Sequence, residues 1–93
     1  MLEIRQNCEN CGKNLPNDSN EAMICTYECT FCAECVGNIL ENVCPNCGGG
    51  FEKRPTRPHK QLDKFPMRTD KVFQPIEFNK FLEINKNIDP RKR

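Results

Sequence analysis

The sequence has no tryptophan, one tyrosine and one histidine, and only 37% of its 93 residues are hydrophobic. No window approaches the roughly 18 apolar residues of a membrane-spanning helix, so we expect no membrane segment. A chain this short buries a small share of its surface, and its apolar core alone gives marginal stability. The sequence therefore needs another source of cohesion.

Catalytic patterns are also missing. We find no nucleophile paired with a base, no paired carboxylates with an evident pocket and no glycine-rich phosphate loop. The single histidine, His59, lies in the basic stretch 54–60, where we expect an exposed loop side chain and not a catalytic base or a metal ligand. We therefore expect a protein that is not an enzyme and has no small-molecule substrate.

Charge is unevenly distributed, although the net formal charge is only +1. Residues 1–50 carry two basic and seven acidic side chains, a formal charge of −5, and residues 51–93 carry twelve basic and six acidic ones, a formal charge of +6. A zinc ion held by four thiolates adds a further charge of about −2. The sequence thus describes an acidic first half followed by a basic tail.

What the sequence does have is cysteine: eight residues, all before Gly48 and all in close pairs. The pairs are Cys8 and Cys11, Cys25 and Cys29, Cys32 and Cys35, and Cys44 and Cys47. A spacing of two or three residues lets one tight turn direct two sulfurs at a single ion. A glycine follows two of the pairs, at positions 12 and 48, and gives such turns the room they need.

Disulfides are the competing explanation for these pairs. They need an oxidising compartment, and residues 1–8 contain charges and no apolar leader segment. We therefore expect a cytoplasmic protein, in which paired cysteines bind metal. Eight thiolates with none left over predict two Zn(Cys)₄ sites. Such sites have no open coordination position and support folding, not hydrolysis.

Spacing alone leaves the pairing of the four pairs open. Sequential pairing gives one site from Cys8, Cys11, Cys25 and Cys29 and another from Cys32, Cys35, Cys44 and Cys47. Interleaved pairing gives Cys8, Cys11, Cys32 and Cys35 for site 1 and Cys25, Cys29, Cys44 and Cys47 for site 2.

Secondary structure is predicted only in short elements. Residues 2–4 alternate in the manner of a strand. The period of Val36, Ile39, Leu40 and Val43 predicts a core-facing helix over residues 32–42. We expect a zinc domain over residues 1–55 and a proline-rich, basic, weakly structured linker over 56–74. The last segment, 75–93, is expected to hold an amphipathic helix over residues 75–87 and a basic end. Its apolar face would carry Phe78, Phe81, Leu82 and Ile88.

The order of the cysteine ligands over residues 8–47 resembles the RING finger. This resemblance implies the interleaved pairing, in a small zinc-stabilised α+β fold of the cross-brace, treble-clef type with short β-hairpins and one short helix. It covers the Cys44-Pro45-Asn46-Cys47 turn. It does not extend to the ubiquitin-ligase surface. RING ligases have a large apolar residue before the second ligand, where this chain has Asn10. They commonly have an aromatic residue before the seventh ligand, where this chain has Asn42 and Val43. A basic residue often follows their last ligand, where this chain has Gly48-Gly49-Gly50.

A closer resemblance covers residues 1–58. The segments Met1–Cys8, Leu15-Pro16, Glu21–Cys32 and Cys44–Gly49, with the Arg54-Pro55 and Arg57-Pro58 repeats, are similar to a small bacterial Cys-rich family, domain of unknown function 1272. That family implies a bacterial cytosolic protein with a zinc-binding fold and no assigned activity. The tail from residue 59 to residue 93 is expected to be particular to this chain.

Three functions fit these observations. The first is a protein-interaction or adaptor module with structural zinc. In it, Tyr27, Phe31 or the apolar face of the tail contacts a protein partner or a second copy, unless the two aromatics pack over the metal sites instead. The second is nucleic-acid binding by the basic residues between Lys53 and Lys71 and between Arg91 and Arg93. A solvated tail is the plainer explanation of those charges. The third is metal or redox sensing through labile thiolates.

Overall fold

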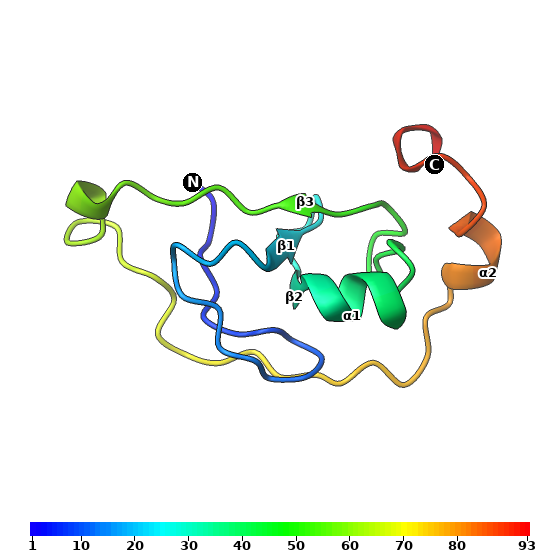
Figure 1. The fold of residues 1–93 in the computed structure, drawn as a ribbon, viewed down its shortest axis with the longest axis horizontal. Helices are drawn as coiled ribbons and strands as arrows, with labels where there is room; N and C mark the ends of the chain where they lie inside the picture. Colours follow the sequence, from blue (N-terminus) through cyan, green and yellow to red (C-terminus); the bar gives the residue numbers. More distant parts are fainter.

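The computed structural model describes residues 1–93, and its secondary structure is confined to short elements joined by turns (Figure 1). Three strands, β1 (Ala22–Ile24), β2 (Thr30–Cys32) and β3 (Glu52–Lys53), form an antiparallel sheet in the order β2-β1-β3. The helices are α1 (Ala33–Asn38) and α2 (Leu82–Asn85), with two 3₁₀ turns, η1 (His59–Gln61) and η2 (Pro90–Lys92). The fold is thus α+β. None of its helices is long and apolar enough to cross a membrane.

The hairpin of β1 and β2 is the centre of the sheet. Ala22 pairs with Cys32, Met23 with Phe31 and Ile24 with Thr30. Five residues, Cys25 to Cys29, close the hairpin at one end, and Cys32 lies at its other end. The hairpin therefore carries cysteines at both of its ends.

Helix α1 follows β2 without a break, and its end has a clear cause. Glu41 and Asn42 have φ angles of +48° and +59°, a left-handed conformation that a right-handed helix cannot continue through. The side chain of Asn42 stabilises this turn, because its Oδ1 accepts a hydrogen bond of 2.9 Å from the backbone N–H of Phe51. The helix predicted over residues 32–42 is therefore shorter, and Ile39 of its predicted apolar face is 49% exposed.

The core is small and half of it is cysteine. Phe31 and Phe51 meet edge to face, with ring centroids 5.5 Å apart. Both belong to a cluster of twelve buried residues, six of which are cysteines: Cys8, Cys25, Cys29, Cys32, Cys35 and Cys44. The apolar side chains alone make only a fragment of a core. The packing depends on what holds the sulfurs.

The N-terminal segment is held by buried arginines instead of a strand. Residues 2–4 form no strand; Ile4 is buried, and an isolated bridge joins Asn7 to Asn14. Arg54 donates to the carbonyl oxygens of Arg5, Leu15 and Pro16, at 2.7, 3.2 and 2.7 Å. Arg57 donates to the carbonyls of Leu2 and Phe65. These two side chains tie the first sixteen residues to the strand that ends the cysteine-rich half.

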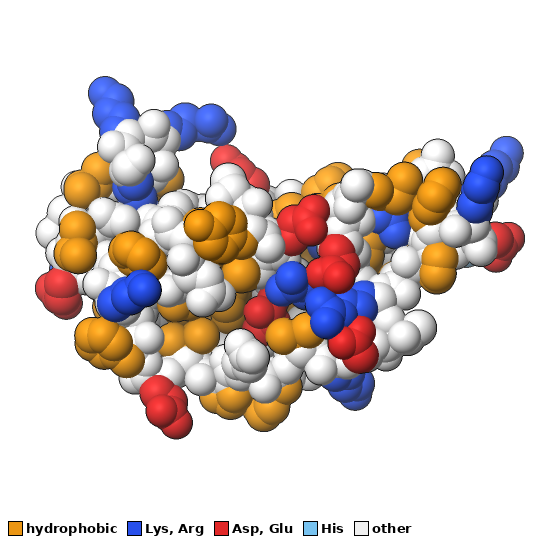
Figure 2. Space-filling view, turned by 180° about the vertical axis from the view of Figure 1, so that it is seen from behind, with side chains coloured by type: hydrophobic (Ala, Val, Ile, Leu, Met, Phe, Trp, Pro, Cys, Tyr) orange, Lys and Arg blue, Asp and Glu red, His pale blue; other side chains and the backbone are white.

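The C-terminal third of the chain returns along the edge of the molecule opposite β3 and ends near α2 (Figure 1). Residues 56–74, predicted to be weakly structured, contain only η1 but are held to the first half by hydrogen bonds. Arg68 N–H donates to the Ile4 carbonyl and Gln74 N–H to the Glu9 carbonyl. Side chains of both signs gather near the middle of the face shown in Figure 2. Among the ion pairs of the molecule, Arg5 pairs with Glu3 and Glu9, and Arg68 pairs with Glu3 and Asp70.

The predicted helix over residues 75–87 is reduced to the four residues of α2. Phe78 precedes it and is 81% exposed, whereas Phe81 and Leu82 are half-buried. The four apolar residues therefore do not share one helical face. Pro75 and the hydrogen bonds that residues 74–79 make with the first half keep this stretch extended.

Candidate metal centres

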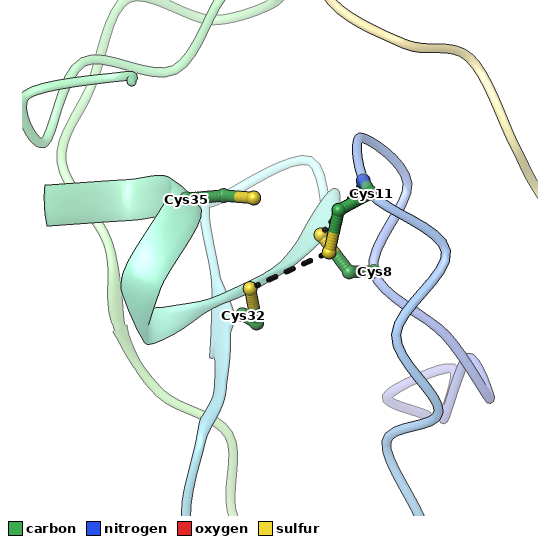
Figure 3. A group of neighbouring side chains, drawn as sticks. All are labelled: Cys8, Cys11, Cys32 and Cys35. Carbon is green, nitrogen blue, oxygen red and sulfur yellow. Dashed lines mark hydrogen bonds between the residues drawn. The ribbon is translucent and has the colours of Figure 1, made fainter. Parts of the chain in front are cut away.

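Four sulfurs from three parts of the chain meet in the first cluster. The loop before Asn14 supplies Cys8 and Cys11, the end of β2 supplies Cys32 and the first turn of α1 supplies Cys35 (Figure 3). All four Sγ atoms lie within 4.8 Å of one another. The structure thus brings together the four residues predicted for site 1.

The first cluster has the dimensions of a tetrahedral thiolate site. For a Zn–S bond of about 2.3 Å, the sulfurs of a regular tetrahedron lie about 3.8 Å apart. The Sγ atoms of Cys11 and Cys32 are 3.8 Å apart, and all eight cysteines are free thiols. Sulfur is the ligand that soft and borderline metal ions prefer, so this donor set fits a thiophilic ion.

The second cluster draws its sulfurs from the hairpin loop and from the turn after α1. The Sγ atoms of Cys25, Cys44 and Cys47 lie within 4.8 Å of one another. Cys29 is outside this closest set, but the thiols of Cys25 and Cys44 are near enough to lower the pKa of Cys29. The four residues predicted for site 2 are therefore neighbours, with Cys29 slightly displaced.

The polypeptide directs N–H groups at the sulfurs, as expected where sulfur carries negative charge. Backbone N–H groups of Cys11, Tyr27, Asn46 and Gly49 donate to Cys8, Cys25, Cys44 and Cys47 at 3.3–3.5 Å. In each turn the donor follows the sulfur by two or three residues. Tight turns at the cysteine pairs thus provide both the spacing and the partial positive charge that thiolates need.

Two asparagine side chains extend this pattern across the clusters. Asn10 Nδ2 donates to Cys35 Sγ at 3.4 Å, and Asn46 Nδ2 donates to Cys29 Sγ at 3.2 Å. Asn10 immediately precedes Cys11, and Asn46 immediately precedes Cys47. Each asparagine therefore sits within one cysteine pair and donates to a sulfur of the second pair in the same cluster. Sequence reasoning treated Asn10 only as a departure from RING ligases. The repeated motif Cys-x-Asn-Cys-Gly, at residues 8–12 and 44–48, is the signal that could have identified both side chains.

The thiols of a cluster do not ionise independently. Burial raises the pKa of Cys35 and of Cys32, whereas a hydrogen bond from the backbone N–H of Lys13 lowers the pKa of Cys11. The adjacent thiol of Cys29 raises the pKa of Cys25 to about 11. Close thiolates repel one another, so some sulfurs keep their protons at neutral pH unless a cation lies between them. A metal ion entering either cluster would displace those protons.

The remaining predicted residues lie outside both clusters. His59 is exposed in η1 and belongs to neither cysteine group. Phe31 is buried in the core, so it packs inside, whereas Tyr27 in the hairpin loop is 63% exposed. Arg54 and Arg57, which the sequence suggested for phosphate contacts, are buried and bonded to backbone carbonyls.

Comparison with known proteins finds a family that matches the cysteine-rich half. Residues 1–57, which include all eight cysteines, match the family described as "Protein of unknown function (DUF1272)". An uncharacterised protein of Rhizobium meliloti (strain 1021) is 53% identical over 75 residues, which are 81% of this chain and 89% of that protein. No solved structure matches.

The length of that alignment corrects one expectation. At most 58 of the 75 aligned residues can fall within residues 1–58, so at least 17 belong to the segment 59–93. That segment is therefore not particular to this chain, because its first part or more has a counterpart in the Rhizobium protein.

Proposed function

The chain belongs to the DUF1272 family, and from the arrangement of its thiols we propose that it is a non-enzymatic domain folded around two zinc ions. Zinc suits four-sulfur tetrahedral sites and has no redox chemistry of its own, which fits a structural role in a reducing cytoplasm. One ion is bound by Cys8, Cys11, Cys32 and Cys35 and the other by Cys25, Cys29, Cys44 and Cys47, in a RING-like cross-brace. The interleaving of the two clusters along the chain supports this arrangement.

The composition of the core is the observation that carries the proposal. Six of twelve core residues are cysteines, and polar N–H groups surround their sulfurs. Eight uncoordinated thiols would contribute little cohesion, and they would repel one another when ionised. With each cluster coordinated, the same residues become two rigid cross-links between segments far apart in the sequence. The metal thus replaces the apolar core that this chain lacks.

The partner is proposed to be another protein, because large apolar side chains remain exposed on the tail. Phe78 is 81% exposed and Ile84 66% exposed, and both lie in a segment whose neighbouring residues pack against the cysteine-rich half. Exposed apolar side chains of this size are typical of interaction surfaces. The domain would then act as an adaptor in which zinc fixes the shape that presents these side chains.

Two measurements test the proposal. Elemental analysis of protein purified under reducing conditions should return about two zinc equivalents per chain, and a chain that binds no metal would contradict the structural role.

The interaction surface is tested with a Phe78→Ser, Ile84→Ser double variant. If the parent protein self-associates in sedimentation, or cross-links to a partner protein, the double variant should lose that association. The Phe65→Ser variant is the control, since Phe65 is also exposed but lies outside this part of the tail. Equal behaviour of the parent and the double variant would remove the interaction surface from the proposal.

Nucleic-acid binding is the weaker alternative. Of the basic residues that suggested it, Arg54 and Arg57 are directed inward and Arg68 pairs with Glu3 and Asp70. Arg91 pairs with Glu52. These four arginines are thus engaged within the chain, whereas the lysines at positions 53, 60, 64, 71 and 92 are exposed and form no ion pair, so the cations that remain for phosphates are fewer than the sequence suggested. Binding to single or double strands that weakens steeply with added salt would nevertheless revive this alternative.

A further inference from the structure

The two metal-binding turns are near copies of each other. We call residues 8–12 the first knuckle and residues 44–48 the second knuckle; both read Cys-x-Asn-Cys-Gly. In each, the glycine N–H donates to the carbonyl of the first cysteine, at 3.0 Å for Gly12 and 2.9 Å for Gly48. Both glycines have left-handed φ angles, +80° and +77°. The turns therefore present the same surface twice, a glycine without a side chain at the metal-binding bend.

A phenylalanine ring from the tail lies over each of these glycines. A Cβ placed on Gly12 would be 3.5 Å from Cε1 of Phe73, and one placed on Gly48 would be 3.1 Å from Cδ1 of Phe81. The first distance is ordinary van der Waals contact, whereas at Gly48 the ring and Nδ2 of Asn85, 2.9 Å from the same point, would have to shift to admit a side chain. The second knuckle thus uses its glycine for the close approach of the tail, and at the first knuckle the left-handed φ is what favours glycine.

Between the two rings, the tail is fixed to the knuckles by hydrogen bonds. Gln74 N–H donates to the Glu9 carbonyl, and Ile76 N–H donates to Asn10 Oδ1 at 2.7 Å. The same Asn10 side chain donates to Cys35 Sγ, so one residue connects the tail to the first cluster.

The second knuckle is held in a similar way. Asn79 Nδ2 donates to the Val43 carbonyl, immediately before the knuckle, and Asn85 Nδ2 to the Gly48 carbonyl, each at 2.9 Å. Lys80 Nζ lies 5.2 Å from the centroid of the Phe81 ring and adds a positive charge near a site that would carry about −2 when metal is bound. The tail therefore contacts both knuckles with aromatic, polar and charged groups.

From this repeated geometry we infer that the two knuckles form a paired docking surface for the chain's own segment 72–85, and that docking of this segment and metal occupancy stabilise each other. The inference rests on the proposed zinc sites. Because coupling between two binding events is reciprocal, a tail that docks only on metal-organised knuckles must also strengthen the binding of metal to them. We expect this gain in affinity to appear as slower release of the metal. Phe73 acts on the first cluster and Phe81 on the second. Phe78, between them, contacts neither glycine and points to solvent.

Metal release from the full-length protein tests this coupling. Zinc-loaded parent, Phe73→Ala, Phe81→Ala and Phe65→Ala proteins are mixed with excess chelator and N-ethylmaleimide, and alkylated cysteines are identified by mass spectrometry over time. Couplings between sites are typically about 5- to 150-fold. Phe73→Ala should therefore expose Cys8, Cys11, Cys32 and Cys35 about fivefold faster or more, with the second cluster unchanged. Phe81→Ala should have the same effect on Cys25, Cys29, Cys44 and Cys47. The Phe65→Ala control should match the parent, because Phe65 is exposed and lies outside segment 72–85.

Tail mobility provides a second readout that does not depend on metal release. In zinc-loaded Phe81→Ala protein, trypsin should cleave after Lys80 and Lys86 faster than in the parent, while residues 1–57 stay protected. Cleavage of the Phe65→Ala control after these two lysines should match that of the parent.

Each outcome decides the inference. Zinc uptake measured before chelator is added tests the proposed function separately, because a parent that takes up no zinc overturns both proposals. If the parent holds two ions and all variants release them at equal rates, the docking inference is wrong and the zinc sites remain. Equal acceleration of both clusters by either variant would also overturn the assignment of one ring to each knuckle.

Discussion

The side chain of Asn46 reaches across the second cluster and donates a hydrogen bond to the sulfur of Cys29, with Nδ2 and Sγ 3.2 Å apart. Asn46 belongs to the Cys44–Cys47 turn and Cys29 to the hairpin loop, so the bond joins the two halves of one metal site. Cys29 lies outside the closest group of sulfurs in this cluster, and Asn46 is the side chain that directs a donor at it. A bond of this kind fixes the orientation of a metal ligand and stabilises its charge.

Replacement of Asn46 by alanine should therefore weaken metal binding at the second cluster. Loss of a hydrogen-bond donor to a metal ligand typically lowers affinity by about 10- to 100-fold. Competition with a chelator of known affinity measures this effect. Asn38→Ala is the matched control, because Asn38 is exposed at the end of α1 and should bind metal as the parent does. Unchanged affinity in Asn46→Ala would show that the bond to Cys29 has no energetic role.

Removal of the metal should unfold the domain. Since half of the core residues are cysteines, chelation under reducing conditions removes the cross-links that hold the remaining apolar side chains together. Circular dichroism and amide exchange should show loss of the sheet, and added zinc should restore it. A chelated, fully reduced protein that retains its fold would contradict the structural role of the metal.

The turn that ends helix α1 offers a test of which side chains face the core. Leu40→Ala should lower the free energy of unfolding by about 2–5 kcal/mol, because Leu40 is fully buried and its removal leaves a cavity. Its neighbour in sequence, Ile39, is 49% exposed, so Ile39→Ala should cost much less. Denaturant unfolding of the zinc-loaded proteins compares the two. Equal losses would mean that Ile39 packs inside, as its periodicity had predicted.

Arg54 should contribute to stability and not to nucleic-acid binding. Its guanidinium donates to three backbone carbonyls, and hydrogen bonds to charged groups contribute about 1.5–3 kcal/mol. Arg54→Lys should lose part of this network, since an ammonium group cannot reproduce the planar fork of the guanidinium. We expect a destabilisation of roughly 2 kcal/mol in denaturant unfolding. The neighbouring Lys53→Gln is exposed and should leave stability within experimental error.

The cysteine-rich half of this protein is more predictable from sequence than its tail. The spacing of the cysteines predicted that the two sulfurs of each close pair face the same site, because one tight turn directs both of them. The interleaved pairing came from the resemblance to the RING finger, since spacing alone leaves it open. It depends on the hairpin of β1 and β2, which separates Cys25 and Cys29 from Cys32 by strands of only three residues. A strand so short gives little signal in the sequence.

The tail was less predictable because its conformation is set by partners far away in the chain. Residues 75–87 have a helical period, but Gln74, Ile76 and Asn79 bond to the first half and keep the segment extended until α2. Arg54 and Arg57 look like solvated cations in a basic stretch, yet both are buried against carbonyls of the N-terminal loops. Long-range hydrogen bonds of this kind have no local periodicity from which to predict them.

Cys29 and Cys32 belong to different thiol clusters although only Thr30 and Phe31 separate them. The short strand between them keeps the Cα atoms of the two cysteines within about 10 Å of each other, at roughly 3.3 Å per residue. One added residue would turn Cys32 to the opposite face of the strand and break a site. Residues 18–20, a loop between the buried Asn17 and the segment that leads into β1, carry no such constraint. Insertions and deletions in related chains should therefore gather in that loop and be absent between Cys29 and Cys32.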